Sequence, residues 1–271
     1  MNPYIELLRP YNGVLAILGI LIGAIVGAAL TSTIPITLAV IVAFLINGAG
    51  NVINDYFDYE IDRINRPKRT IPSGRVKRSS VLNYFLLLIL VSLILAYFVS
   101  IYFFYIAVIN SIVSFVYSWK LKETPIIGNI AVSWLAASTF LAGALIALGS
   151  LNISVLVLAS LAFLATLSRE IFKDIEDAKG DSTAKIKTLP LVIGETKAAI
   201  VASIVLIVGI LSLVMPVYYK LFSVFYYIGM IPAVLICMAA IRYMKNAHKA
   251  QKFIKISMYF VFLGFILGTI L

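Results

Sequence analysis

Apolar residues along this chain gather into long runs that short polar segments separate. A run of about 20 apolar residues has the length of a helix that crosses a bilayer. The runs lack the alternation of barrel strands, and open sheets cannot lie in lipid, so each run predicts a transmembrane helix. Nine are predicted, at about 13–30, 34–53, 81–99, 101–118, 126–149, 153–170, 198–215, 221–241 and 253–271.

Composition supports a membrane protein. Hydrophobic residues make up 62% of the 271 positions and charged residues only 13%. A soluble domain carries about a quarter charged residues. We therefore predict an all-α polytopic membrane protein.

The basic residues predict how the helices are oriented. Of the 22 Lys and Arg residues, all but Lys220 flank the predicted spans on one side. Since cytoplasmic loops carry the excess of Lys and Arg, we expect the N-terminus in the cytoplasm and the C-terminus outside the cell membrane. The 12 acidic residues share the cytoplasmic side, so we expect the active site there. Loops that contact anionic headgroups explain the net charge of +10, and no nucleic-acid partner is expected.

Two polar segments carry aspartates at the same spacing, i, i+3 and i+7. On a helix this spacing places three side chains on one face. The repeat at the ends of the second and sixth predicted spans suggests two related halves, about 1–122 and 123–271, within a single domain 1–271. The two triads are Asp55, Asp58 and Asp62, and Asp174, Asp177 and Asp181.

Carboxylates so close together repel one another near a membrane unless cations lie between them. One interpretation is that they are solvated helix ends, but the repeated spacing favours a cation site. Oxygen ligands favour Mg²⁺ or Ca²⁺, and Mg²⁺ typically binds through a few carboxylates and substrate phosphates. The single cysteine, Cys237, and the single histidine, His248, are not expected to bind metal.

Basic residues follow both triads on segments that contain proline or glycine. Carboxylates that hold Mg²⁺ beside Arg and Lys side chains that bind oxyanions are typical of a diphosphate site. No glycine-rich nucleotide loop is present, so a nucleotide is not expected.

A diphosphate site in a membrane protein suggests a substrate with a lipid tail. Allylic prenyl diphosphates fit, because cations neutralise the departing diphosphate and the spans shield the carbocation from water. We therefore expect the helices to surround a central cavity. A transporter is the less favoured alternative, because the central parts of the predicted spans carry no charge.

The two motifs resemble the signatures of the UbiA superfamily of intramembrane prenyltransferases. NDxxDxxxD is matched at 54–62, its DRxxRPxRPxxxG continuation at 62–74 with Thr70 in place of a common proline, and RExxKDIEDxxGD at 169–181. The resemblance covers the whole chain. It implies transfer of a prenyl group with the help of two Mg²⁺ ions that bridge the diphosphate.

The resemblance also implies roles for the site residues. The six aspartates are the catalytic residues, with Asp55 and Asp174 as supporting ligands or bases. Which of the two lysines after the fourth span matches the family's loop stays open. The implied metal ligands are Asn54, Asp58, Asp62, Asp177 and Asp181. The candidate substrate-binding residues are Asn51, Asn54, Arg66, Arg69, Tyr117, Lys120, Lys122, Lys185, Lys187 and Arg9.

The "LLRPYN" start and the wording of the first motif resemble the archaeal ether-lipid branch of the family. This resemblance implies geranylgeranyl diphosphate as donor and the free hydroxyl of geranylgeranylglyceryl phosphate as acceptor. Such an acceptor needs a second oxyanion site, for which Arg9, Lys185, Lys187 and the loop after the eighth span are candidates. An aromatic acceptor such as 4-hydroxybenzoate is the alternative. Membrane lipids are expected partners, and no obligate protein partner is inferred.

Overall fold

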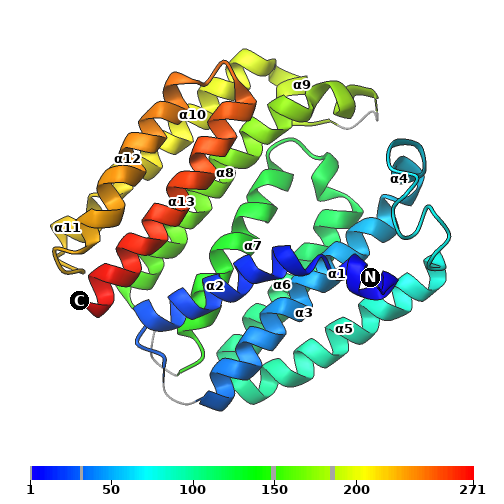
Figure 1. Ribbon diagram of the computed structural model, residues 1–271, viewed down its shortest axis with the longest axis horizontal. Coiled ribbons are helices and arrows are strands. Elements are labelled where there is room, and N and C mark those ends of the chain that lie inside the picture. The colour runs from blue at the N-terminus through cyan, green and yellow to red at the C-terminus, as the bar shows by residue number, and fades with distance from the viewer. Residues whose placement is uncertain (1, 31–32, 148–150, 184–186) are drawn as a thin grey trace. The chain divides into compact units, whose positions relative to one another are not determined.

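The computed structural model describes residues 2–30, 33–147, 151–183 and 187–271, and it gives their side chains except at 12, 65 and 179–183. The described part of the chain is helical and contains no strand, as the apolar runs predict (Figure 1). The helices are α1 (Pro3–Leu8), α2 (Pro10–Val26), α3 (Thr33–Phe57), α4 (Tyr59–Asn65), α5 (Arg78–Val99), α6 (Ile101–Trp119), the 3₁₀ helix η1 (Leu121–Glu123), α7 (Ile127–Ala144), α8 (Ile153–Thr183), α9 (Leu189–Ile193), α10 (Glu195–Ser212), α11 (Met215–Tyr218), α12 (Tyr226–Arg242) and α13 (Ala247–Ile270).

Polar caps divide the apolar sequence into separate helices. Ser100 alone separates α5 from α6, with an extended backbone and a hydroxyl that accepts a hydrogen bond from the backbone N–H of Phe103 at 3.1 Å. Asn246 caps α13 in the same way, accepting from the N–H of Lys249 at 3.0 Å. Such side chains satisfy backbone donors that the first helical turn leaves free, so helices begin at these positions.

Seven helices in the described part of the chain are long and apolar enough to cross a membrane. The other two predicted spans coincide with α2 and α12, which have 17 residues each. At 1.5 Å per residue such a helix extends about 26 Å, less than the roughly 30 Å of hydrocarbon in a typical bilayer. That the chain crosses the membrane nine times therefore stays a prediction. The seven are Thr33–Phe57, Arg78–Val99, Ile101–Trp119, Ile127–Ala144, Ile153–Ala178, Glu195–Tyr218 and Ala247–Ile270.

The contacts divide the chain into two compact units, each described here by itself. Unit 1 comprises 1–24, 28–121 and 138–150, and unit 2 comprises 25–27, 122–137 and 151–271. The first aspartate triad belongs to unit 1 and the second to unit 2. That the two halves are related repeats stays a prediction.

In unit 1, α3 packs against α1, α5 and α6. Leu7 of α1, Val52 of α3 and Phe85 of α5 share one buried cluster. The short helix α1 comes so close to α3 that a Cβ atom at Gly48 would lie 2.7 Å from Cδ2 of Leu8. Glycine at 48 thus lets α1 lie beside the helix that carries the first motif.

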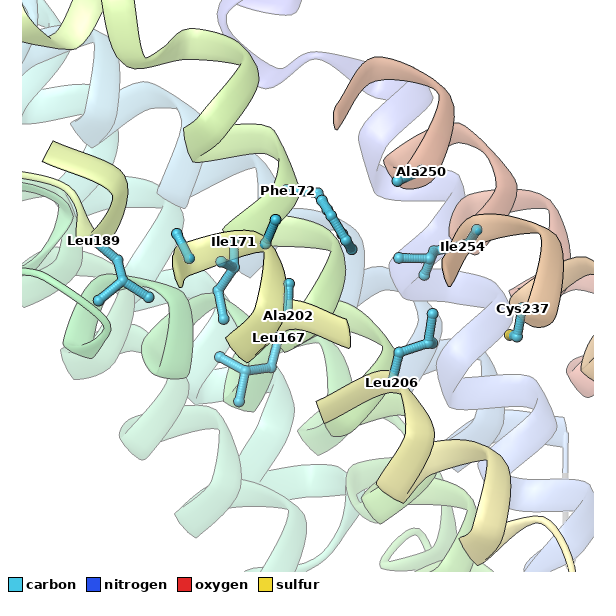
Figure 2. Packing of buried hydrophobic residues seen from close by; sticks show 12 residues of the cluster. Leu167, Ile171, Phe172, Leu189, Ala202, Leu206, Cys237, Ala250 and Ile254 are labelled. Atoms are coloured by element: carbon cyan, nitrogen blue, oxygen red, sulfur yellow. The ribbon is translucent and has the colours of Figure 1, made fainter. Parts of the chain in front are cut away.

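In unit 2, α8 packs against α10 and α13, and α12 runs along α13. Figure 2 shows this core, in which Ile171 and Phe172 of α8 share one buried cluster with Leu206 of α10 and Ile254 of α13. Phe172 and Ile254 are fully buried. The cluster continues up to the part of α8 that carries the second motif, so packing fixes that end of the helix within unit 2.

Candidate functional site

The first aspartate triad lies where α3 ends and α4 begins. Asp55 belongs to α3, Asp58 precedes α4 with φ −78° and ψ 2°, and Asp62 lies in α4. The spacing predicts three side chains on one face of a helix, and the structure interrupts that helix at Asp58, where a ψ near zero leaves the α-helical range. The backbone N–H of Asp58 still donates to the carbonyl of Asn54 at 2.9 Å, and that of Asp62 to the carbonyl of Asp58 at 2.8 Å.

Two arginines neutralise the buried carboxylates of this triad. Nη1 of Arg69 donates to Oδ2 of Asp62 at 2.5 Å and lies 3.4 Å from Oδ1 of Asp55. Arg9 donates from Nη2 to the same Asp55 oxygen. Asp55 and Asp62 are only 8% and 5% exposed, and a carboxylate so buried needs a paired cation. That Arg9 and Arg69 bind substrate stays a prediction.

The asparagines beside the triad are engaged as well. Nδ2 of Asn54 donates to Oδ2 of Asp58 at 2.8 Å. Nδ2 of Asn51 donates to the carbonyl of Leu8 at 3.1 Å, which ties the end of α1 to α3. The side chain of Arg66 is exposed. The polar face that the sequence predicts is therefore largely satisfied by contacts within unit 1.

A second contact that sequence reasoning missed holds α1. Arg75 donates from Nη1 and Nη2 to the two carboxylate oxygens of Glu6 at 2.6 and 2.8 Å, across 69 positions of sequence. The hydrogen bond from Arg75 is the largest cause that lowers the pKa of Glu6 below its ordinary value. Arg75 also donates to the carbonyl of Lys68 at 3.2 Å. The segment that carries Arg69 is thereby fastened to α1.

The second triad lies on one continuous helix, α8, as predicted. Asp174 accepts a hydrogen bond at 2.8 Å from Nδ2 of Asn129, a residue of α7 that is 7% exposed. Asp177 is exposed. The side chain of Asp181 and the whole of Lys185 lie outside the described residues, and Lys187 is exposed.

Two further contacts surround this triad. Arg169 donates to Glu170, which is 9% exposed, at 2.5 Å. Oε1 of Glu176 lies 2.8 Å from Nδ1 of His248, so the start of α13 contacts α8 beside the second motif. Asn129 and Glu176 were not predicted, because their partners lie 45 and 72 positions away and no local spacing signals them.

The remaining predicted residues lie at the end of α6 and just after it. Tyr117 is half-buried, Lys120 caps α6 and is exposed, and Lys122 belongs to η1. Lys120 belongs to unit 1 and Lys122 to unit 2. The structure therefore does not decide between the two lysines.

The donor chemistry of the triads fits a hard cation. Among the described side chains, no three His, Cys, Asp or Glu residues are gathered into a ready metal site. Both triads offer oxygen ligands, and the first adds the amide oxygen of Asn54, which suits Mg²⁺. Each unit thus contains oxygen donors of the kind that Mg²⁺ prefers, and that they bind the metal stays a prediction.

Comparison with known proteins identifies the family. The model of the "UbiA prenyltransferase family" matches residues 16–265 of the chain. The chain belongs to this family. A digeranylgeranylglyceryl phosphate synthase from Methanosphaera stadtmanae is 40% identical over 276 residues, which cover 100% of both proteins. The family that the motifs predict is confirmed.

Solved structures of UbiA proteins share the fold. A structure described as "Structural and mechanistic insights into the biosynthesis of Digeranylgeranylglyceryl phosphate synthase in membranes" is 33% identical, with a TM-score of 0.87 over 99% of this chain and 98% of that one. A UbiA homolog from Archaeoglobus fulgidus bound to DMAPP and Mg²⁺ is 19% identical, with a TM-score of 0.71 over 99% of both chains. At that identity the similarity shows the fold alone.

Proposed function

We propose that this UbiA protein transfers a geranylgeranyl group from geranylgeranyl diphosphate to the free hydroxyl of geranylgeranylglyceryl phosphate. This is a step of archaeal ether-lipid synthesis. The observation that carries the proposal is the 40% identity, over the full length of both proteins, to a digeranylgeranylglyceryl phosphate synthase. The structure with TM-score 0.87 supports the same reading. In the reaction, the C–O bond to the diphosphate breaks, the acceptor oxygen bonds to the freed prenyl carbon, and the hydroxyl proton leaves.

We further propose that both aspartate motifs supply ligands to two Mg²⁺ ions. The Archaeoglobus fulgidus homolog solved with DMAPP and Mg²⁺ supports the use of Mg²⁺ with a prenyl diphosphate. Bound Mg²⁺ neutralises charge on the departing diphosphate. The ligands would be Asn54, Asp58, Asp62, Asp177 and Asp181.

The other site residues bind and orient the substrates. Arg66, Arg69, Tyr117 and one of the two lysines after α6 bind the diphosphate, because guanidinium and ammonium groups pair with its oxygens. Asp55 and Asp174 support the metal ligands, held by Arg9 and Asn129 respectively. Held side chains need less ordering when substrate arrives, which favours reaction.

The proposed topology has nine spans around a central cavity, with the N-terminus and the active site on the cytoplasmic side. It counts α2 and α12 as spans although each is short for a typical bilayer. The distribution of Lys and Arg supports the orientation. The apolar surroundings would keep water from the allylic cation.

A product assay tests the proposal. Purified protein in nanodiscs receives geranylgeranyl diphosphate, Mg²⁺ and, in separate reactions, geranylgeranylglyceryl phosphate or 4-hydroxybenzoate. We expect a prenylated lipid phosphate and released diphosphate in the first reaction only. Formation of prenylated 4-hydroxybenzoate without the lipid product would contradict the proposed acceptor, but prenyl transfer as the reaction class would stand. No product in any reaction, from folded protein, would contradict prenyl transfer.

A further inference from the structure

We propose that Arg69 is a positioning residue that holds Asp62 in the metal-free protein and passes to the donor diphosphate when the site is loaded. This inference rests on the proposed function. It adds an exchange of partners, in which one guanidinium first takes the place of a metal cation and then binds the substrate.

The contacts of Asp62 carry the first step. Its carboxylate is 5% exposed and accepts from Nη1 of Arg69 at 2.5 Å. Arg69 is the one cation on Asp62 among the described side chains. A buried carboxylate without a cation is strongly unfavourable, so Arg69 holds Asp62 in place before metal arrives.

The same contact is incompatible with a fully loaded site. A guanidinium and a divalent cation on one carboxylate repel each other, and the repulsion is strong where the carboxylate is buried. Asp62 can act as a metal ligand once Arg69 has moved away. The incoming diphosphate offers Arg69 a better partner, because guanidinium binds phosphate oxygens in a bidentate manner.

The charges balance after the exchange because of Arg9. Arg9 donates to Oδ1 of Asp55, the same atom that lies 3.4 Å from Arg69. When Arg69 leaves, Asp55 keeps Arg9 and Asp62 gains the metal. Neither buried carboxylate is left without a cation at any stage.

The position of Arg69 in the chain makes the movement easy. It lies in the turns between α4 and α5, and its side chain is 24% exposed. No helix has to unwind, because rotation about side-chain bonds is enough to change its partner. The turns themselves are fastened by Arg75 to Glu6.

The test measures Mg²⁺ binding without donor, by titration calorimetry and by the rise in melting temperature with Mg²⁺. We expect Arg69→Gln to bind Mg²⁺ several-fold more tightly than the wild type, because the competing cation is gone. With Mg²⁺ present, we expect the same variant to bind inorganic diphosphate several-fold more weakly. A merely structural role would weaken both ligands together.

Arg63→Gln is the matched control. Arg63 lies on α4, is exposed and pairs with exposed Glu60 at 3.7 Å, so the change removes the same charge from the same region. We expect its Mg²⁺ affinity to equal that of the wild type. Unchanged or weaker Mg²⁺ binding by Arg69→Gln would overturn the inference.

A second variant covers the case in which Arg69→Gln does not fold. Arg69→Met removes the charge and keeps an unbranched side chain, so tighter Mg²⁺ binding is again expected, and unchanged or weaker binding overturns the inference. The product assay on the wild type separates the two proposals. If the wild type forms product but the variants show no gain in Mg²⁺ affinity, the exchange of partners is rejected and the proposed function stands. If the wild type forms no product, the proposed function is rejected.

Discussion

At the scale of residues, the two aspartate triads share a spacing but differ in surroundings. In the first, Asp55 and Asp62 are buried and paired with arginines. In the second, Asp177 is exposed and Asp174 is held by the neutral amide of Asn129. The first triad therefore has its own cations before metal arrives.

Removing one proposed ligand from either motif tests whether both act on the same reaction. Asp58→Asn and Asp177→Asn keep the size of the side chain and remove its charge. We expect each to lower prenyl transfer by about 100-fold or more, since changes even to groups that support metal ligands cost 10–100-fold. Product formation under saturating donor and acceptor is the measurement, with circular dichroism to verify the helices.

Glu60→Gln provides the control for charge alone. Glu60 lies in α4 next to the first motif, and its side chain is 70% exposed. We expect near wild-type transfer. Full activity in both aspartate variants would contradict a shared metal site.

At the scale of elements, α1 holds the parts of the first motif together. Leu7 packs on α3, Asn51 of α3 donates to the carbonyl of Leu8, and Arg9 reaches Asp55. Arg9 itself has φ 49°, a left-handed conformation that residues with a Cβ adopt rarely. The backbone turns there so that α1 can end and its arginine can face the aspartate. The contact between Glu6 and Arg75 also attaches the loop that carries Arg69 to α1.

Acid should loosen this contact in a defined direction. Because Arg75 lowers the pKa of Glu6 in the folded protein, the contact stabilises the fold above the ordinary glutamate pKa of about 4.3 and loses its effect as the pH falls below it. The pair is partly exposed and water screens it, so its contribution to stability is small.

Hydrogen exchange in α1 measures this small effect locally. We expect Glu6→Gln to exchange faster than the wild type over residues 3–9 at pH 6, after correction for intrinsic rates. At pH 3 the difference should be smaller, because the contact weakens as Glu6 becomes protonated. A difference that persists unchanged at pH 3 would show that the charge of Glu6 is not responsible.

At the scale of the whole molecule, charge distribution is the property that sets orientation. Lys220 follows α11, apart from the other 21 basic residues in the predicted topology. Lys245 follows α12 within a group of bases. Both side chains are exposed. If the predicted orientation is right, these two side chains therefore lie on opposite faces of the membrane.

Cysteine labelling in intact cells tests the orientation. Cys237→Ala first removes the single native thiol, which is buried. Lys220→Cys should then react with a membrane-impermeant maleimide in intact cells, and Lys245→Cys only after the membrane is opened, because basic loops stay in the cytoplasm. The reverse pattern would contradict the predicted orientation, and equal labelling of both sites in intact cells would contradict a span between them.

The sequence by itself determined the helical class, the family and the residues of both motifs. Apolar length sets which segments can form helices in lipid, and the spacing of Asp174 and Asp177 along α8 follows from helical periodicity. These are local properties, so they can be read from neighbouring residues. The break at Asp58 was missed, because a single residue with ψ near zero leaves the periodic spacing unchanged.

Only the tertiary structure decided which partner each charge takes. Arg9 meets Asp55 across 46 positions, Arg75 meets Glu6 across 69 and Asn129 meets Asp174 across 45. Such pairs form because tertiary packing, such as that of α1 on α3, brings distant segments together, and a buried carboxylate such as Asp55 then requires a donor. The sequence contains many donors that could pair with such a carboxylate, and the fold decides which of them lie close enough.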